Sequence, residues 1–116
     1  MANRHAVLVA FAFPILLAAC GGPPPAPDTL NGVALFKSHC ALCHGQDGKD
    51  KVNPNVKIDM TSPEWQKSLA DEQIVNVIKQ GLPAKGMPPF VTTLPDDQIN
   101  AIIKDEIRGQ FGKEGK

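Results

Sequence analysis

The sequence lacks several features that mark whole classes of protein. Positive and negative charges balance, with 12 lysines and arginines against 12 aspartates and glutamates, so the composition gives no sign of a nucleic-acid-binding surface. Tyrosine is absent and tryptophan occurs once. No stretch alternates apolar and polar residues as a half-buried strand does. Since 116 residues leave room for one domain, these absences favour a single all-α domain.

Cysteine is also scarce, and two of the three cysteines form the main motif. Cys40 and Cys43 lie three residues apart with His44 directly after them, which is the attachment pattern of c-type haem. Each thiol can add across one porphyrin vinyl group, and His44 is then placed as an axial iron ligand. Gly45 allows a sharp turn away from the macrocycle. A disulfide, a redox-active dithiol and half a zinc site are the alternatives, but the sequence offers neither a second ligand pair nor a βαβ context.

The third cysteine follows an export signal. Residues 6–17 are almost wholly apolar, too short for a membrane span of about 20 residues but typical of a secretory signal. Residues 17–20 read Leu-Ala-Ala-Cys, which resembles a bacterial lipobox and implies cleavage before Cys20 and acylation of that residue. Several acyl chains give stable anchoring. An ordinary cleaved signal with an unrelated cysteine and an uncleaved anchor are the alternatives.

These segments predict three parts of the chain. Residues 1–19 form the lipoprotein signal peptide, residues 20–28 the lipidated Cys20 and a proline-rich tether, and residues 29–116 the haem domain. The tether is expected to be extended, and at ~3.1 Å per residue it spans about 25 Å. The domain is therefore expected close to the periplasmic side of a bacterial membrane, with the choice between inner and outer membrane open.

Apolar spacing and capping residues predict four helices. Their expected ranges are 29–39, 62–69, 71–80 and 96–108. Asp28 is expected to cap the first helix, which contains Gly32, and Gly81 to end the third. The buried stripe of the last helix is expected to consist of isoleucines, namely Ile99, Ile102, Ile103 and Ile107. Residues 46–61 show no periodicity and indicate a long loop.

A proline-rich loop presents Met87 between the last two helices. Three prolines stiffen this loop: Pro83, Pro88 and Pro89. A stiff loop with one thioether is suited to supply a sixth iron ligand. Met60 is the competing sulfur but lacks flanking prolines, and Lys57 and Lys85 are weaker alternatives. His39 is expected to be a surface residue.

Together these motifs resemble class I cytochrome c in its small bacterial single-haem form. The resemblance covers nearly all of residues 28–109 and rests, besides the cysteine motif, on three segments: Gly32-x-x-Leu35-Phe36, Gly86-Met87-Pro88-Pro89-Phe90, and Leu94-Pro95-Asp96-Asp97-Gln98-Ile99 with Ile107-Arg108. It implies an all-α cytochrome c fold, with four or so helices and long loops around one covalently bound haem c.

The resemblance also implies the ligands of that haem. Cys40 and Cys43 would carry the thioethers, His44 would be the proximal ligand and Met87 the distal one. In the family, a proline at the position of Pro54 offers its carbonyl to the other ring nitrogen of the ligand histidine, which fixes the tautomer.

Two further features of the family concern packing and the haem edge. Trp65 resembles the indole that donates to a haem propionate, with simple core filling as the alternative. Gly32 and Phe36 resemble the residues where the first and last helices cross. Glu106 departs from the family, which often has an aromatic residue there, and Phe111 is a candidate to replace that contact.

Ligation by histidine and methionine favours ferrous iron relative to two nitrogen ligands and leaves no open site for a substrate. The sequence therefore predicts a membrane-tethered, single-haem electron carrier rather than an enzyme. It is expected to be a monomer that exchanges electrons with redox proteins in or near the membrane and to dock through the apolar residues 87–90. A haem-based gas or redox sensor and an accessory electron-entry subunit of a membrane oxidase or reductase are the alternatives.

Overall fold

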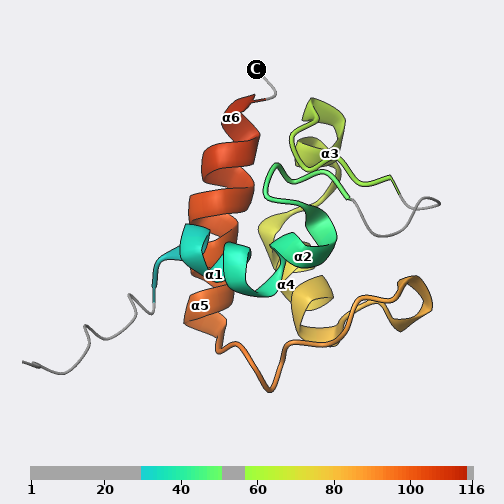
Figure 1. The fold of residues 1–116 in the computed structure, drawn as a ribbon, viewed down its shortest axis with the longest axis vertical. Coiled ribbons are helices and arrows are strands. Elements are labelled where there is room, and N and C mark those ends of the chain that lie inside the picture. Colours follow the sequence, from blue (N-terminus) through green and yellow to red (C-terminus); the bar gives the residue numbers. More distant parts are fainter. Residues whose placement is uncertain (1–29, 51–56, 115–116) are drawn as a thin grey trace, which may run out of the picture.

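Helices make up the regular structure of residues 30–50 and 57–114, the part of the chain that the computed structural model describes (Figure 1). In chain order they are α1 (Gly32–His39), α2 (Ala41–His44), α3 (Pro63–Ser68), α4 (Asp71–Gln80), η1 (Pro83–Lys85), α5 (Asp96–Ala101), η2 (Ile102–Phe111) and α6 (Gly112–Glu114). Within these ranges there are two isolated β-bridges, Lys49–Asp59 and Leu82–Met87, and no strand. The predicted all-α fold is confirmed.

Some predictions concern residues outside the described ranges. The signal peptide, Cys20, the tether and Pro54 all lie there. Among the residues that are described, no helix has the length and apolar character needed to cross a membrane.

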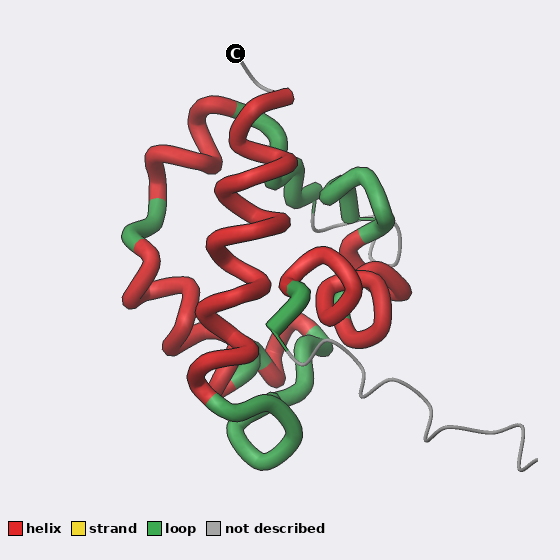
Figure 2. Tube along the Cα trace, turned by 90° about the vertical axis from the view of Figure 1, so that its left-hand side faces the viewer, coloured by secondary structure: helices red, strands yellow, loops and turns green. Residues whose placement is uncertain are grey.

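The longest element is the C-terminal helix, which runs without a break from α5 through η2 to α6 (Figure 2). It begins at Asp96, as predicted, and its isoleucine stripe is buried. The prediction that it ends at Arg108 is wrong. The helix continues because Phe111 is 2% exposed and packs edge-on against Phe36, with ring centroids 5.2 Å apart. Phe111 therefore supplies the aromatic contact that Glu106 cannot make.

The first helix begins later than predicted. Its N-cap is Asn31, whose side chain accepts a hydrogen bond from the Ala34 N–H at 3.0 Å, so the prediction that Asp28 caps this helix is wrong. Asparagine and aspartate cap helices about equally well, and Asn31 lies directly before the first helical residue. Gly32 is consequently the first residue of α1 rather than a mid-helix glycine.

Gly32 is where α1 touches the C-terminal helix. A Cβ atom at this position would lie 1.9 Å from the carbonyl oxygen of Ala101, so only glycine lets the two backbones approach this closely. The Gly32 N–H donates to Asp105 Oδ2 at 3.0 Å, which satisfies one of the exposed donors at the start of α1. The predicted crossing of the two helices is therefore present, at Gly32 and Phe36.

The shorter helices are tied to the C-terminal helix by Arg108. Its guanidinium donates to the Gln66 carbonyl at 2.6 Å, to the Leu69 carbonyl at 2.6 Å and to Asp71 Oδ1 at 2.8 Å. The Gln66 side chain in turn donates to the Ile107 carbonyl at 2.8 Å. This network fixes the end of α3 and the start of α4.

Glu106 is a buried carboxylate in the same helix. It is 4% exposed, and its Oε2 atom has no hydrogen-bond partner among the described residues. Burial raises the pKa of Glu106, Lys37 opposes this shift, and Glu114 adds to it. The charged form therefore destabilises the folded protein.

We expect Gly32→Ala to destabilise the protein by about 3 kcal/mol, because the added methyl group meets backbone rather than a movable side chain. The free energy of unfolding can be measured by urea titration of the haem-loaded protein. Gly112→Ala is the control, since the nearest atom to its Cβ would be the Gln66 Oε1 at 3.2 Å and the nearest backbone atom, the Ile107 carbonyl oxygen, would lie at 3.8 Å; it should change stability by no more than about 1 kcal/mol. Equal losses in both variants would contradict a tight crossing at Gly32.

We expect Glu106→Gln to stabilise the protein at neutral pH by on the order of 1 kcal/mol, because it removes a buried, unpartnered charge. The pKa of Glu106 is raised in the folded state. The free energy of unfolding therefore falls as the pH rises from the ordinary pKa of 4.5 through the folded-state pKa. Urea titrations at about pH 4 and about pH 8 should show the gain only at the higher pH. Glu72→Gln, on the exposed side of α4, is the control. An equal gain in stability at both pH values would show that ionisation of Glu106 is not the cause.

Candidate functional site

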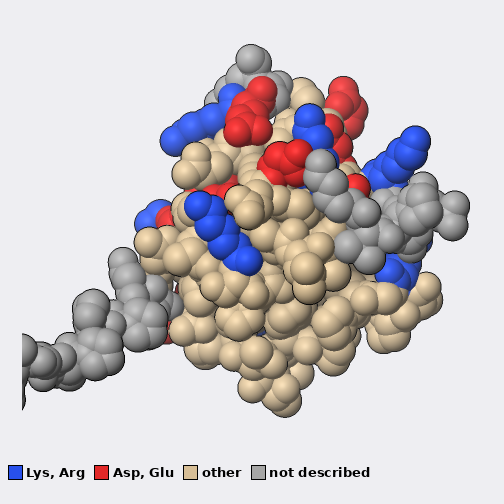
Figure 3. Space-filling view, in the orientation of Figure 1, with Lys and Arg blue, Asp and Glu red and all other residues tan. Residues whose placement is uncertain are grey.

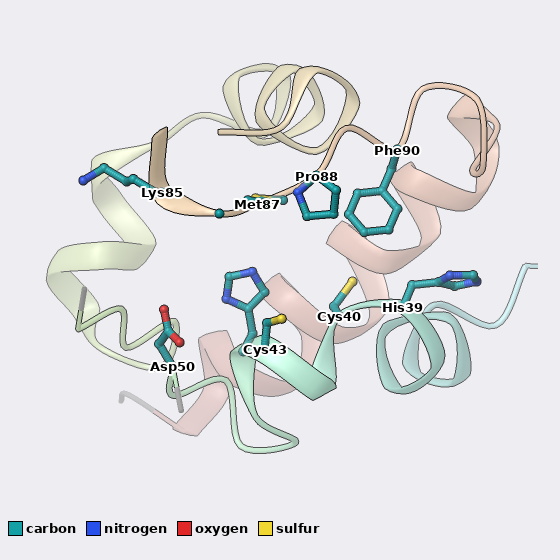
Figure 4. Close-up of a pocket in the computed structure, with 10 residues that line it drawn as sticks. His39, Cys40, Cys43, Asp50, Lys85, Met87, Pro88 and Phe90 are labelled. Atoms are coloured by element: carbon teal, nitrogen blue, oxygen red, sulfur yellow. The ribbon is translucent and has the colours of Figure 1, made fainter. Parts of the chain in front are cut away.

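A cavity of about 330 Å³ lies between the cysteine motif and the methionine loop (Figure 4). It is within the range of roughly 300–1,000 Å³ found for small-molecule sites. Ten residues line it: His39, Cys40, Cys43, His44, Asp50, Lys85, Gly86, Met87, Pro88 and Phe90. They come from α1, α2, the loop after α2, η1 and the segment that follows η1.

One wall of the cavity is built by α2. The Cys40 N–H donates to the Phe36 carbonyl at 2.8 Å, so the cysteine motif begins at the residue that ends α1. The single turn of α2 places Cys43 and His44 in the cavity wall, while Leu42 is 88% exposed. Gly45, with a φ of 75°, then turns the chain away, as predicted. Both thiols are free, so the disulfide alternative has no support in this geometry.

Burial controls the protonation of this wall. It raises the pKa of the Cys40 thiol to about 11, with a smaller contribution from Cys43. Burial also lowers the pKa of His44, and the nearby Asp50 carboxylate partly opposes the shift. A neutral imidazole is the form that binds metals, so the wall offers two thiols and an unprotonated ligand within one turn.

The second ring nitrogen of His44 is available for a further bond. Its Nδ1 atom is buried and has no hydrogen-bond partner among the described residues. A histidine ligand normally uses this second nitrogen to donate to a carbonyl or carboxylate. The role of Pro54 as that acceptor stays a prediction, because Pro54 lies outside the described residues. An orphaned ring nitrogen beside two thiols fits the donor set that a covalently attached haem needs.

The opposite wall is the Met87 loop, which is fixed by backbone contacts. Leu82 and Met87 exchange two backbone hydrogen bonds, at 2.9 and 3.2 Å, and the Phe90 N–H donates to the Ile78 carbonyl at 3.0 Å. Gly81, with a φ of 68°, ends α4, and a Cβ there would lie 2.6 Å from the Met87 carbonyl oxygen. Figure 4 shows Met87 across the cavity from Cys43.

The competing ligands lie elsewhere or at the margin. Met60 is 6% exposed in the hydrophobic core and does not line the cavity. Lys57 does not line it either, whereas Lys85 does. His39 is exposed, as predicted, and its ring lies edge-on to Phe90 with centroids 6.4 Å apart. The geometry therefore favours Met87 among the candidate sulfur ligands.

Trp65 is partly buried against the hydrophobic core and is not among the residues that line the cavity. This placement agrees with core filling, and its contact with a propionate stays a prediction.

Asp50 was not identified as a site residue from the sequence. It reaches the cavity because its N–H donates to the Ile58 carbonyl at 2.9 Å across the loop, and no local spacing reveals such a contact.

Comparisons with known proteins agree with this geometry. Residues 27–104 match the family model described as cytochrome c oxidase, cbb3-type, subunit III. The chain is 28% identical over 95 residues to cytochrome c6 of Nostoc sp., which covers 82% of this chain and 83% of that protein. The solved structure of the KustC0563 c-type cytochrome is 31% identical and superposes with a TM-score of 0.62, over 68% of this chain and 95% of that one.

Other relatives are matched over a smaller part of their length. The chain is 32% identical over 72 residues to the cbb3-type cytochrome c oxidase subunit FixP of Rhizobium etli, which is 61% of this chain and 24% of FixP. It is 31% identical over 71 residues to endomucin of Mus musculus, 61% of this chain and 27% of that protein. The chain thus spans about a quarter of these two relatives.

Proposed function

Since the chain belongs to the family described as cytochrome c oxidase, cbb3-type, subunit III, we propose that it is a membrane-tethered single-haem electron carrier with histidine and methionine as iron ligands. As a c-type cytochrome it carries covalently bound haem c and transfers electrons. The observation that carries the proposal is the juxtaposition of the cysteine motif and Met87 across one cavity.

In this proposal each wall of the cavity has its own role. Cys40 and Cys43 would bond the porphyrin, His44 would be the proximal ligand and Met87 the distal ligand. The haem supplies a one-electron ferric–ferrous couple when bound. A neutral His44 can donate to iron, and the Met87 thioether favours the reduced state relative to a second nitrogen ligand. Pro54 would orient His44, and Trp65 would donate to a propionate.

With His44 and Met87 both ligating the iron, no position would remain where a substrate or gas could reach it. This supports a relay rather than an enzyme or a sensor. A sensor needs Met87 to leave easily, and the backbone contacts of Leu82 and Gly81 with the Met87 segment oppose that movement.

The description of the matching family favours a second candidate, an accessory subunit that feeds electrons to a membrane oxidase. Co-purification of an oxidase from detergent-solubilised membranes would support this candidate.

The docking surface is proposed to be the apolar rim formed by residues 87–90. From residue 86 to residue 95 there is no lysine, arginine, aspartate or glutamate, and Val91 is 53% exposed. In Figure 3 the lower edge of the molecule shows neither lysine and arginine nor aspartate and glutamate side chains. Electron-transfer encounters are small and transient, which suits contact between uncharged surfaces. The partners are redox proteins in or near the same membrane, and the carrier acts as a monomer.

The location of the carrier is part of the proposal. Residues 1–19 would direct export, Cys20 would carry the lipid, and residues 20–28 would hold the haem domain (residues 29–116) at the periplasmic side of a bacterial membrane. A tether of this length keeps the domain near its membrane partners and raises their effective concentration.

We expect Met87→Ala to open the iron to carbon monoxide. The native reduced protein should not bind carbon monoxide, and its oxidised form should show the far-red band of a sulfur–iron bond. The variant should bind carbon monoxide and lose that band completely, because the distal position is vacant. Met60→Leu is the control and should behave like the native protein, since Met60 lies in the core. Binding of carbon monoxide by the native protein would favour the sensor.

We expect Cys20→Ala to move the protein from the membrane fraction to the soluble periplasmic fraction, because the acyl chains supply the anchoring. Fractionation with detection of haem measures this, and mass spectrometry of the N-terminal peptide identifies the lipid on the native chain. An unchanged haem content in the variant shows that export and maturation are intact. Retention of the Cys20→Ala protein in the membrane would refute lipid anchoring at this residue.

A further inference from the structure

The cavity has one charged end. Asp50 is the carboxylate that lines it and Lys85 is the ammonium group. Figure 4 shows both on the side of the cavity away from His39 and Phe90, with Lys85 on the wall of Met87 and Asp50 on the wall of Cys43. The end near Phe90 carries no aspartate, glutamate, lysine or arginine among its lining residues.

We propose that Asp50 and Lys85 flank the propionate edge of the haem and tune its reduction potential in opposite directions, with Lys85 raising it and Asp50 lowering it. The inference rests on the proposed haem site. The two vinyl groups lie at one edge of the porphyrin and the two propionates at the opposite edge. With Cys40 and Cys43 bonded to the vinyl groups, the propionates would face the end of the cavity that carries Asp50 and Lys85.

Lys85 is positioned to meet a carboxylate. It is the last residue of η1 and lies two residues before Met87 in the sequence. Its backbone N–H donates to the Leu82 carbonyl at 2.8 Å, which fixes the backbone at this position. No acidic side chain of the described residues forms an ion pair with Lys85. Its ammonium group is therefore available to a propionate, and a positive charge beside the haem disfavours the ferric state.

Asp50 acts from the other wall. Its N–H donates to the Ile58 carbonyl at 2.9 Å, and Asp50 lines the cavity together with His44. Because Asp50 and His44 line the same cavity, the carboxylate lies on the side from which His44 would ligate iron. A negative charge at this place stabilises the more positive ferric state and lowers the potential.

The test is potentiometric titration of the haem-loaded protein with Asp50→Asn and Lys85→Gln. We expect Asp50→Asn to increase the equilibrium constant for reduction, and Lys85→Gln to decrease it, by about threefold to tenfold at low ionic strength. A tenfold change is about 59 mV for a one-electron couple. The effect of Lys85→Gln should shrink in high salt, because Lys85 is exposed.

Four control variants isolate the charge. Asp50→Glu and Lys85→Arg keep the charges and should restore most of the native potential. Glu72→Gln and Lys67→Gln remove exposed charges that do not line the cavity, and they give the background shift. The far-red sulfur–iron band must be retained in every variant, which shows that Met87 still ligates.

Shifts of the same sign in Asp50→Asn and Lys85→Gln, or a shift of either no larger than the background, would overturn the proposal. If the far-red band is intact, such a result does not contradict the proposed function as a carrier with histidine and methionine ligands. Absence of that band from the native protein, or binding of carbon monoxide by it, would instead refute the proposed function itself. The two failures are therefore distinguishable.

Discussion

The close crossing of α1 over the C-terminal helix is the contact on which the rest of the structure depends. The backbones meet at Gly32 and Ala101, and the rings of Phe36 and Phe111 meet further along the two helices. Phe111 also contacts the loop after the cysteine motif, since a Cβ at Gly48 would lie 2.9 Å from its ring. One aromatic side chain thus supports both the helix before the motif and the chain after it.

The opposite wall of the cavity depends on the same helix by a different route. Arg108 binds the end of α3 and the start of α4, and α4 leads at Gly81 directly into the backbone of the Met87 loop. The two walls share no strand or disulfide within the described residues. Their separation is set because each is fixed to the C-terminal helix.

Much of this arrangement was predictable where it rests on local chemistry. The bounds of α4, the start of the C-terminal helix at Asp96 and the capping of α3 by Ser62 follow from periodicity and from residues that satisfy helix ends. The cysteine motif and the prolines around Met87 are equally local signals. Each depends on residues within a few positions of one another.

The predictions that failed, or were not made, depend on distant contacts. The C-terminal helix passes Arg108 because Phe111 packs on Phe36, 75 positions earlier in the sequence. The start of α1 was predicted too early because Asp28 is also a residue type that caps helices well, whereas the observed cap, Asn31, directly precedes the Gly32 that packs against Ala101. The placement of Asp50 and Lys85 on one cavity depends on loops that periodicity does not describe.

The way in which Met87 is held has a consequence for how such a carrier can diversify. Backbone groups of Leu82, Phe90 and Gly81 make the contacts that fix the loop. Its exposed side chains are therefore not needed to hold the Met87 segment in position. A substitution at an exposed position that does not line the cavity, such as Val91, can alter this surface while Met87 keeps its place. In the proposed carrier, partner choice and iron ligation can therefore evolve separately on the segment from Leu82 to Val91.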